Sequence, residues 1–94
     1  MAADAKLWEE NTIAVTTNMT RLNPGVGVRT VWVTGDVAIN VVHSATDLDG
    51  QATPSDVFQV AAGVAFPIEI PDNGRYTHIS GASAGNASLM GIRG

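Results

Sequence analysis

The chain has 94 residues and a mass of 9.7 kDa, which is enough for one small hydrophobic core. It contains no cysteine, so a disulfide scaffold, a zinc ribbon and a thiol enzyme are excluded. Nine acidic against five basic residues give a net charge of −4, which argues against a nucleic-acid partner, because such binding depends on Lys and Arg contacts with phosphate.

The N-terminal segment differs in composition from the rest of the chain. Residues 1–11 are predicted to form an arm and residues 12–94 a single β domain. The arm lacks the basic and apolar regions of a signal peptide, and no run in the chain approaches the ~18 apolar residues of a membrane span, so no membrane partner is expected. Leu7 and Trp8 are its large apolar residues, and they either dock on a partner or fold back onto the domain.

The β domain is poor in charge and rich in β-branched residues. From Asn11 to Gly94 there are ten charged residues in 84, well below the usual ~25%, so we expect partners to cover much of the surface. Val, Ile and Thr make up 26 of the 94 residues, as is typical of strands.

Alternating apolar residues between turn signals predict seven short strands and no helix of ordinary length. The predicted strands are Thr12–Met19, Val28–Val33, Val37–His43, Val57–Val60, Val64–Ile70, Arg75–Ser80 and Ala87–Arg93. This pattern predicts an all-β sandwich or small barrel. The predicted core consists of large apolar residues on these strands: Trp32, Ile39, Val41, Phe58, Phe66, Ile68, Ile79 and Leu89.

Turn signals also suggest which strands are neighbours. Thr34-Gly35-Asp36 is short enough to join Val28–Val33 and Val37–His43 in a hairpin, and the first of these strands is apolar on both faces, as if covered on both sides. Pro67 cannot donate a ladder hydrogen bond, so its strand is predicted to lie at a sheet edge. The strand Arg75–Ser80 is expected to pair back onto it.

The residue types for catalysis are present without a recognisable motif. His43 and His78, the only histidines, could join Ser44 or Ser80 in a hydrolytic triad, but there is no Gly-x-Ser-x-Gly elbow. Both histidines are interpreted as structural or rim residues. We predict no enzyme activity and no catalytic residue, and keep a small hydrolase as an alternative.

The polar loop Ser44–Asp56 is long for a compact β domain. Asp47-Leu48-Asp49-Gly50 is similar to the start of an EF-hand, but position twelve is Phe58, where the motif needs Glu. A looser calcium site of Asp47, Asp49 and Asp56 stays open, although a solvated acidic loop is preferred and no metal or cofactor is predicted. With Tyr76 and Trp8, the loop could instead bind a sugar by stacking, as in a small carbohydrate-binding β module.

The order of motifs after Val28 is more specific. The chain runs V-R-T-V-W-V-T-G-D-V, then a polar loop, V-F-Q-V-A-A-G-V-A-F-P-I-E-I, a basic residue, a small-residue loop and an apolar last strand. Over residues 28–93 it resembles small virion proteins of tailed bacteriophages and gene transfer agents, of the spike-base type. The matching residues are Gly35-Asp36-Val37, Phe58, Gly63, Phe66-Pro67-Ile68 and Arg75.

The resemblance implies a structural protein of the capsid surface, made in the host cytoplasm. It would act as a spike-base or decoration (cement) subunit, contact the major capsid protein or a spike or fibre protein, and carry no catalytic residue. We expect a homo-oligomer, a trimer or pentamer. The predicted partner-binding residues are Leu7, Trp8 and Tyr76.

Overall fold

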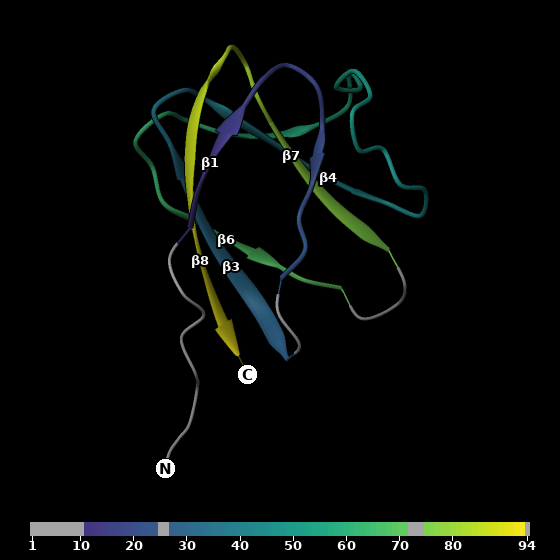
Figure 1. Ribbon diagram of the computed structural model, residues 1–94, viewed down its shortest axis with the longest axis vertical. Coiled ribbons are helices and arrows are strands. Elements are labelled where there is room, and N and C mark those ends of the chain that lie inside the picture. Colours follow the sequence, from purple (N-terminus) through teal and green to yellow (C-terminus); the bar gives the residue numbers. More distant parts are fainter. Residues whose placement is uncertain (1–10, 25–26, 72–74, 94) are drawn as a thin grey trace.

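Eight strands and their connections make up the part of the chain that the computed structural model describes, which is residues 11–24, 27–71 and 75–93 (Figure 1). The strands are β1 (Asn11–Val15), β2 (Thr20–Arg21), β3 (Val28–Gly35), β4 (Ile39–Ser44), β5 (Phe58–Val60), β6 (Phe66–Glu69), β7 (Tyr76–Gly81) and β8 (Gly85–Arg93). Among these residues there is no helix that could cross a membrane.

The strands form two antiparallel sheets of four. The first sheet has the order β1-β8-β3-β6 and the second the order β2-β7-β4-β5. Successive strands alternate between the sheets, except for β4 and β5, and the pairs β1–β8, β2–β7, β3–β6 and β4–β5 are nested like one long folded hairpin. This is the topology of an eight-stranded jelly roll. The prediction of an all-β sandwich is confirmed.

The predicted neighbours in the sheets are wrong in two places. Strands β3 and β4 do not form a hairpin, because Gly35-Asp36-Val37 carries the chain from one sheet to the other. Asp36 fixes this crossing: its N–H donates to the carbonyl of Asn86, and its Oδ1 accepts the Asn86 N–H at 2.8 Å. Likewise, β7 pairs with β4 and β2, and not with β6.

The core lies between the two sheets. Five predicted core residues are buried there and a sixth, Phe66, is partly buried against them. The five are Ile39, Val41, Ile68, Ile79 and Leu89. Pro67 lies in β6, at the edge of the first sheet, as predicted. The predicted strand Thr12–Met19 is shorter in the structure, since β1 ends at Val15, but Met19 is fully buried.

Two predicted core residues are exposed. Trp32 is 37% exposed because its neighbours Val31 and Val33 are the ones that face the core, and alternation along β3 turns Trp32 outward. Phe58 is opposite the buried Val41, but it lies on the three-residue edge strand β5, with no further strand beyond it. It is therefore 53% exposed, and its contact is with the ring of Phe66, centroid to centroid 4.8 Å.

The outer faces of the two sheets are covered differently. On the second sheet, Asn40, His78 and Ser80 point away from the core, yet all three are buried. The loop between β4 and β5 covers them: Thr53 hydrogen-bonds to Ser80 and Leu48 to His78. The loop is thus packed on its own domain. No described segment covers Trp32 on the first sheet in this way.

Candidate functional site

The uncovered outer face of the first sheet carries a row of apolar side chains. Trp32 of β3 lies opposite Met90 of β8 on one side and Pro67 of β6 on the other. Ile92, two residues beyond Met90, is on the same side of β8. We call Trp32, Pro67, Met90 and Ile92 the Trp32 face. Trp32 and Met90 each remain 37% exposed.

Small, uncharged residues flank the Trp32 face at one end, and at the other end Glu69, two residues beyond Pro67 on β6, accepts the Thr30 hydroxyl at 3.5 Å. A shallow hollow of about 150 Å³ lies beside the Trp32 ring, and its other outward-facing walls are Thr34, Ala65, Ser88 and Met90. Exposed apolar surface with polar groups at its rim is typical of a protein contact. The sequence pattern predicted Trp32 in the core and did not single out Met90, so this surface was missed. The signal was available, because Val31 and Val33 fix which side of β3 bears Trp32.

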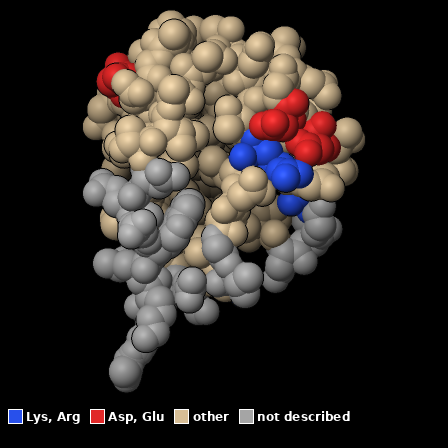
Figure 2. Space-filling model, viewed as in Figure 1, with Lys and Arg blue, Asp and Glu red and all other residues tan. Residues whose placement is uncertain are grey.

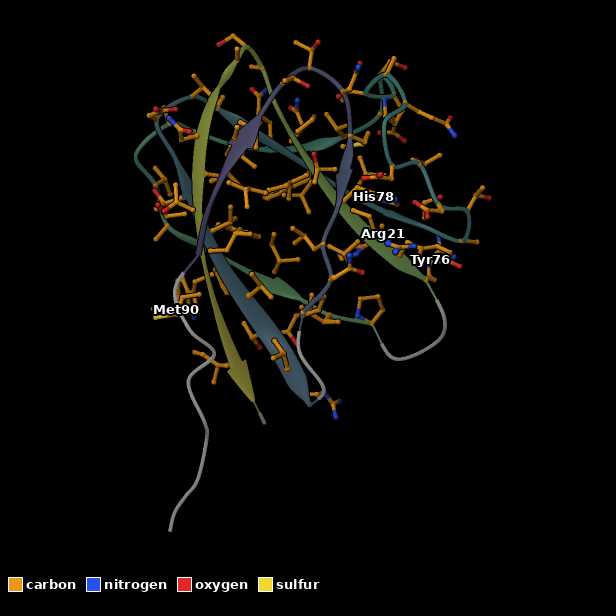
Figure 3. The ribbon with its side chains drawn as sticks, in the orientation of Figure 1. Arg21, Tyr76, His78 and Met90 are labelled. Carbon is orange, nitrogen blue, oxygen red and sulfur yellow. The ribbon has the colours of Figure 1, made fainter. Side chains whose placement is uncertain are left out.

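Charged side chains gather elsewhere on the molecule. Figure 2 shows a mixed group of acidic and basic side chains at the right of the view and a separate acidic patch at the upper left. The remaining described surface in that view bears no Lys, Arg, Asp or Glu. In Figure 3, Met90 lies at the left of the molecule, whereas Arg21, Tyr76 and His78 lie together at the right. The Trp32 face is therefore separate from the mixed group of charged side chains around Arg21.

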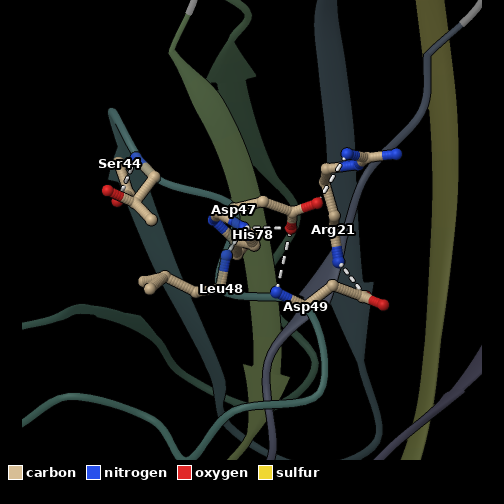
Figure 4. Close-up of polar contacts among 7 residues, drawn as sticks. Arg21, Ser44, Asp47, Leu48, Asp49 and His78 are labelled. Atoms are coloured by element: carbon tan, nitrogen blue, oxygen red, sulfur yellow. Dashed lines mark hydrogen bonds and ion pairs between the residues drawn. The ribbon is translucent and has the colours of Figure 1, made fainter.

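The mixed group is an ion-pair cluster that holds the β4–β5 loop (Figure 4). The guanidinium of Arg21 pairs with Asp47 Oδ2 at 2.7 Å, and the Arg21 N–H donates to Asp49 Oδ1 at 2.9 Å. The Asp49 N–H donates to Asp47 Oδ1. This hydrogen bond, followed by the charge of Arg21, holds the pKa of Asp47 below its ordinary value, and burial opposes the shift only in part.

This cluster also bears on the calcium alternative. The two carboxylates that the sequence offered as ligands, Asp47 and Asp49, are used by the guanidinium and backbone amides of their own domain. Across the described ranges there is no group of three His, Cys, Asp or Glu side chains arranged to hold a metal ion. The loop instead makes a tight turn, in which the Gln51 N–H donates to the Leu48 carbonyl and Gly50 takes a φ of 82°.

The two histidines occupy different environments. His43 lies on the wall of the groove that contains Phe58 and Phe66, and one of its ring nitrogens, Nδ1, is hydrogen-bonded to the Thr77 hydroxyl at 3.0 Å. Burial first, and then the charge of Arg75, lower the pKa of His43. His78 is fully buried beneath the β4–β5 loop and accepts the Leu48 N–H at Nε2.

The serines considered for a triad make other contacts. Ser44 Oγ accepts the Thr46 N–H, while Ser80 Oγ is hydrogen-bonded to Asn40 and Thr53. These contacts tie the loop and the second sheet together. The described hydrogen bonds therefore join neither serine to a histidine.

Of the predicted partner-binding residues, Tyr76 is on the surface and Leu7 and Trp8 lie outside the described residues. Tyr76 is 37% exposed at the start of β7. The Arg21 guanidinium lies 5.5 Å from the centre of its ring, in a cation–π contact that occupies one face. A hollow of about 330 Å³ lies beside the ring, with walls that include Arg21, Pro24, Ile70 and Arg75.

A second apolar groove opens between the edge strands of the two sheets. It measures about 290 Å³, with Phe58 and Phe66 on its walls and His43 and Glu69 as polar groups. Its existence follows from the edge position of β5 and β6.

Comparison of the chain with protein-family models, curated proteins and solved structures finds no match. The argument for function therefore depends on the chain's own residues.

Proposed function

We propose that the chain is a virion structural protein, a spike-base or decoration subunit that forms a homo-oligomer on the capsid surface. One observation carries the proposal: the Trp32 face is apolar and no described segment covers it, while the equivalent face of the second sheet is closed by the chain's own loop. A sandwich with one closed and one open face has an evident side for contact with another protein.

Two further features support the same role. Jelly rolls occur in viral capsid proteins, although the fold is shared with lectins and does not define function. The resemblance over residues 28–93 is to virion proteins, and its Gly35-Asp36-Val37 motif is the crossing between sheets that Asp36 ties to β8. The partners in this proposal are the major capsid protein or a spike or fibre protein, together with further copies of the chain.

A small carbohydrate-binding module is the second candidate. Tyr76 favours it, because an exposed ring beside a hollow that has Arg21 and Arg75 on its walls can stack on a sugar. The contact with Arg21 leaves only one face of that ring for such stacking. We therefore rank this candidate below the virion role.

The test is to follow the full chain, with a small C-terminal tag, through particle production in the organism that encodes it. We expect the chain to migrate with particles on a density gradient, at a fixed number of copies per particle. Light scattering of the purified chain is expected to give the mass of a trimer or pentamer. A chain that stays at the top of the gradient and binds members of a glycan array would overturn the proposal in favour of the second candidate.

A further inference from the structure

His78 connects the second sheet with the β4–β5 loop through a single ring nitrogen. Its side chain is fully buried, and Nε2 accepts the backbone N–H of Leu48 at 2.9 Å. A backbone N–H only donates, so Nε2 carries no proton and the ring is neutral, with its proton on Nδ1. Nδ1 itself is buried and has no hydrogen-bond partner among the described residues.

The surroundings of the ring offer a second partner for Nε2. Asp47 Oδ1 lies 3.6 Å away, on the residue next to Leu48. Nε2 therefore lies near both a donor, the Leu48 N–H, and an acceptor, Asp47 Oδ1. Without a proton it can bond only to the donor, and with a proton only to the acceptor. The charged and titratable groups around the ring are Asp47 and Asp49 of the loop, Arg21 of β2, His43 of β4 and Tyr76 of β7.

We propose that His78 is a proton-operated latch for the turn formed by residues 47–51. The neutral ring holds the turn closed by accepting the Leu48 N–H. The protonated ring has a donor at Nε2, which opposes the Leu48 N–H across 2.9 Å, and it pairs instead with the Asp47 carboxylate. The latch therefore opens when the ring takes up a proton and closes when the ring releases it.

The turn connects this latch to the rest of the domain. The Met19 N–H donates to the Gln51 carbonyl at 2.7 Å, and the Gly50 N–H donates to the Met19 carbonyl at 2.8 Å. Met19 is 1% exposed beneath these contacts. When the Leu48 N–H is released, the turn loosens. Its hydrogen bonds to Met19, in the β1–β2 connection, then weaken, and the Met19 side chain becomes exposed. The latch is independent of the proposed virion role, because it acts on the opposite sheet from the Trp32 face.

Nuclear magnetic resonance of the full chain tests the latch directly. At pH 8 the imidazole nitrogen shifts should report a proton on Nδ1 of His78. As the pH is lowered from 8 to 5, the hydrogen-exchange protection factor of the Leu48 amide should fall by at least roughly tenfold, while that of Val31 in β3 stays constant. The methyl signal of Met19 should shift along the same titration curve.

Two variants separate the latch from other histidine effects. In His78→Gln, the side-chain amide oxygen can accept the Leu48 N–H and does not titrate, so Leu48 should be protected at both pH values. His43→Gln is the matched control, and it should keep the wild-type pH response. If His78→Gln does not fold, the wild-type titration alone decides.

Four results would overturn the proposal. They are a proton on Nε2 at pH 8, equal protection of Leu48 at both pH values, joint loss of protection at Leu48 and Val31, and loss of the response in His43→Gln. Joint loss would mean that the whole domain unfolds and that the turn does not open separately.

Discussion

A charge placed in the Trp32 face should abolish association of the chain with its own copies and with particles. The fold of the free domain should stay intact. The change we choose is Met90→Lys, at the residue opposite Trp32 in the register of β3 and β8. Met90 is 37% exposed, so the aliphatic part of lysine can follow the same path over the sheet while its ammonium group reaches water. The stability of the free domain should therefore change by no more than about 0.5 kcal/mol.

The effect on association follows from the surface that a partner would cover. An aromatic side chain buries roughly 150–250 Å², so the exposed 37% of Trp32 leaves roughly 50–90 Å² for a partner. At about 25 cal/mol per Å², this surface contributes about 1–2 kcal/mol per contact. An unpaired ammonium held in the same interface costs several kcal/mol more. Together these terms give a loss of at least about 3 kcal/mol, or roughly 100-fold in affinity.

The assay compares three proteins by light scattering over a concentration series and by migration with particles. They are the wild-type chain, Met90→Lys, and the control Ala82→Lys, which adds the same charge to the exposed β7–β8 connection. Association should be lost in Met90→Lys alone, with thermal midpoints that differ little among the three. If Met90→Lys associates like the wild type, the Trp32 face is not the contact surface and the reasoning fails.

Four further predictions concern the arm, the core, the crossing and the loop. A chain that begins at Asn11 should keep its fold, because β1 begins there, but bind particles more weakly if the arm is an anchor; undiminished binding would contradict the anchor. Ile79→Ala should lower the free energy of unfolding by about 2–5 kcal/mol in urea titration, because Ile79 is fully buried between the sheets. Asp36→Ala should lower it by about 1 kcal/mol through loss of the hydrogen bond from Asn86, whereas Asp36→Asn, which keeps an acceptor, should lower it less. The lowered pKa of Asp47 means that its ionised form adds stability above the ordinary value of 3.8, and that this stability is lost as the pH falls through the lowered pKa. Thermal midpoints of the wild type and Asp47→Asn should therefore differ at pH 7 and converge in strong acid; a constant difference would contradict this assignment.

The sequence pattern correctly identified seven of the eight strands and most of the inward-facing residues, because alternation is a local property of the chain. It missed β2, whose two residues are too few to show alternation. Ile39, Val41 and Ile79 are buried as expected. Alternation does not specify which strands are neighbours, since a hairpin and a crossing between sheets leave the same pattern. The short connection at Asp36 was therefore assigned to a hairpin, and the structure shows a crossing.

The sequence pattern did not predict that Asn40, His78 and Ser80 are buried, for a different reason. Alternation along β7 places His78 on the opposite side from Ile79, which is the outer side of the second sheet. Whether that side is wet or covered depends on where the β4–β5 loop packs. The loop is held there by the ion pair between Arg21 and Asp47, which are 26 residues apart in the chain. The sequence around neither residue indicates that the two side chains are in contact.

A comparison of the outer faces of the two sheets indicates where the low charge of the β domain matters. The composition alone suggested that partners cover much of the surface. On the second sheet the cover belongs to the chain itself, since the β4–β5 loop closes over His78, Ser80 and Asn40 with Arg21 as its ion-pair anchor. Of the two outer sheet faces, that of the first sheet is the one without a cover from the described part of the chain. The contact that the composition implies is therefore assigned to one face, which Met90→Lys tests, while the opposite face contains the histidine latch.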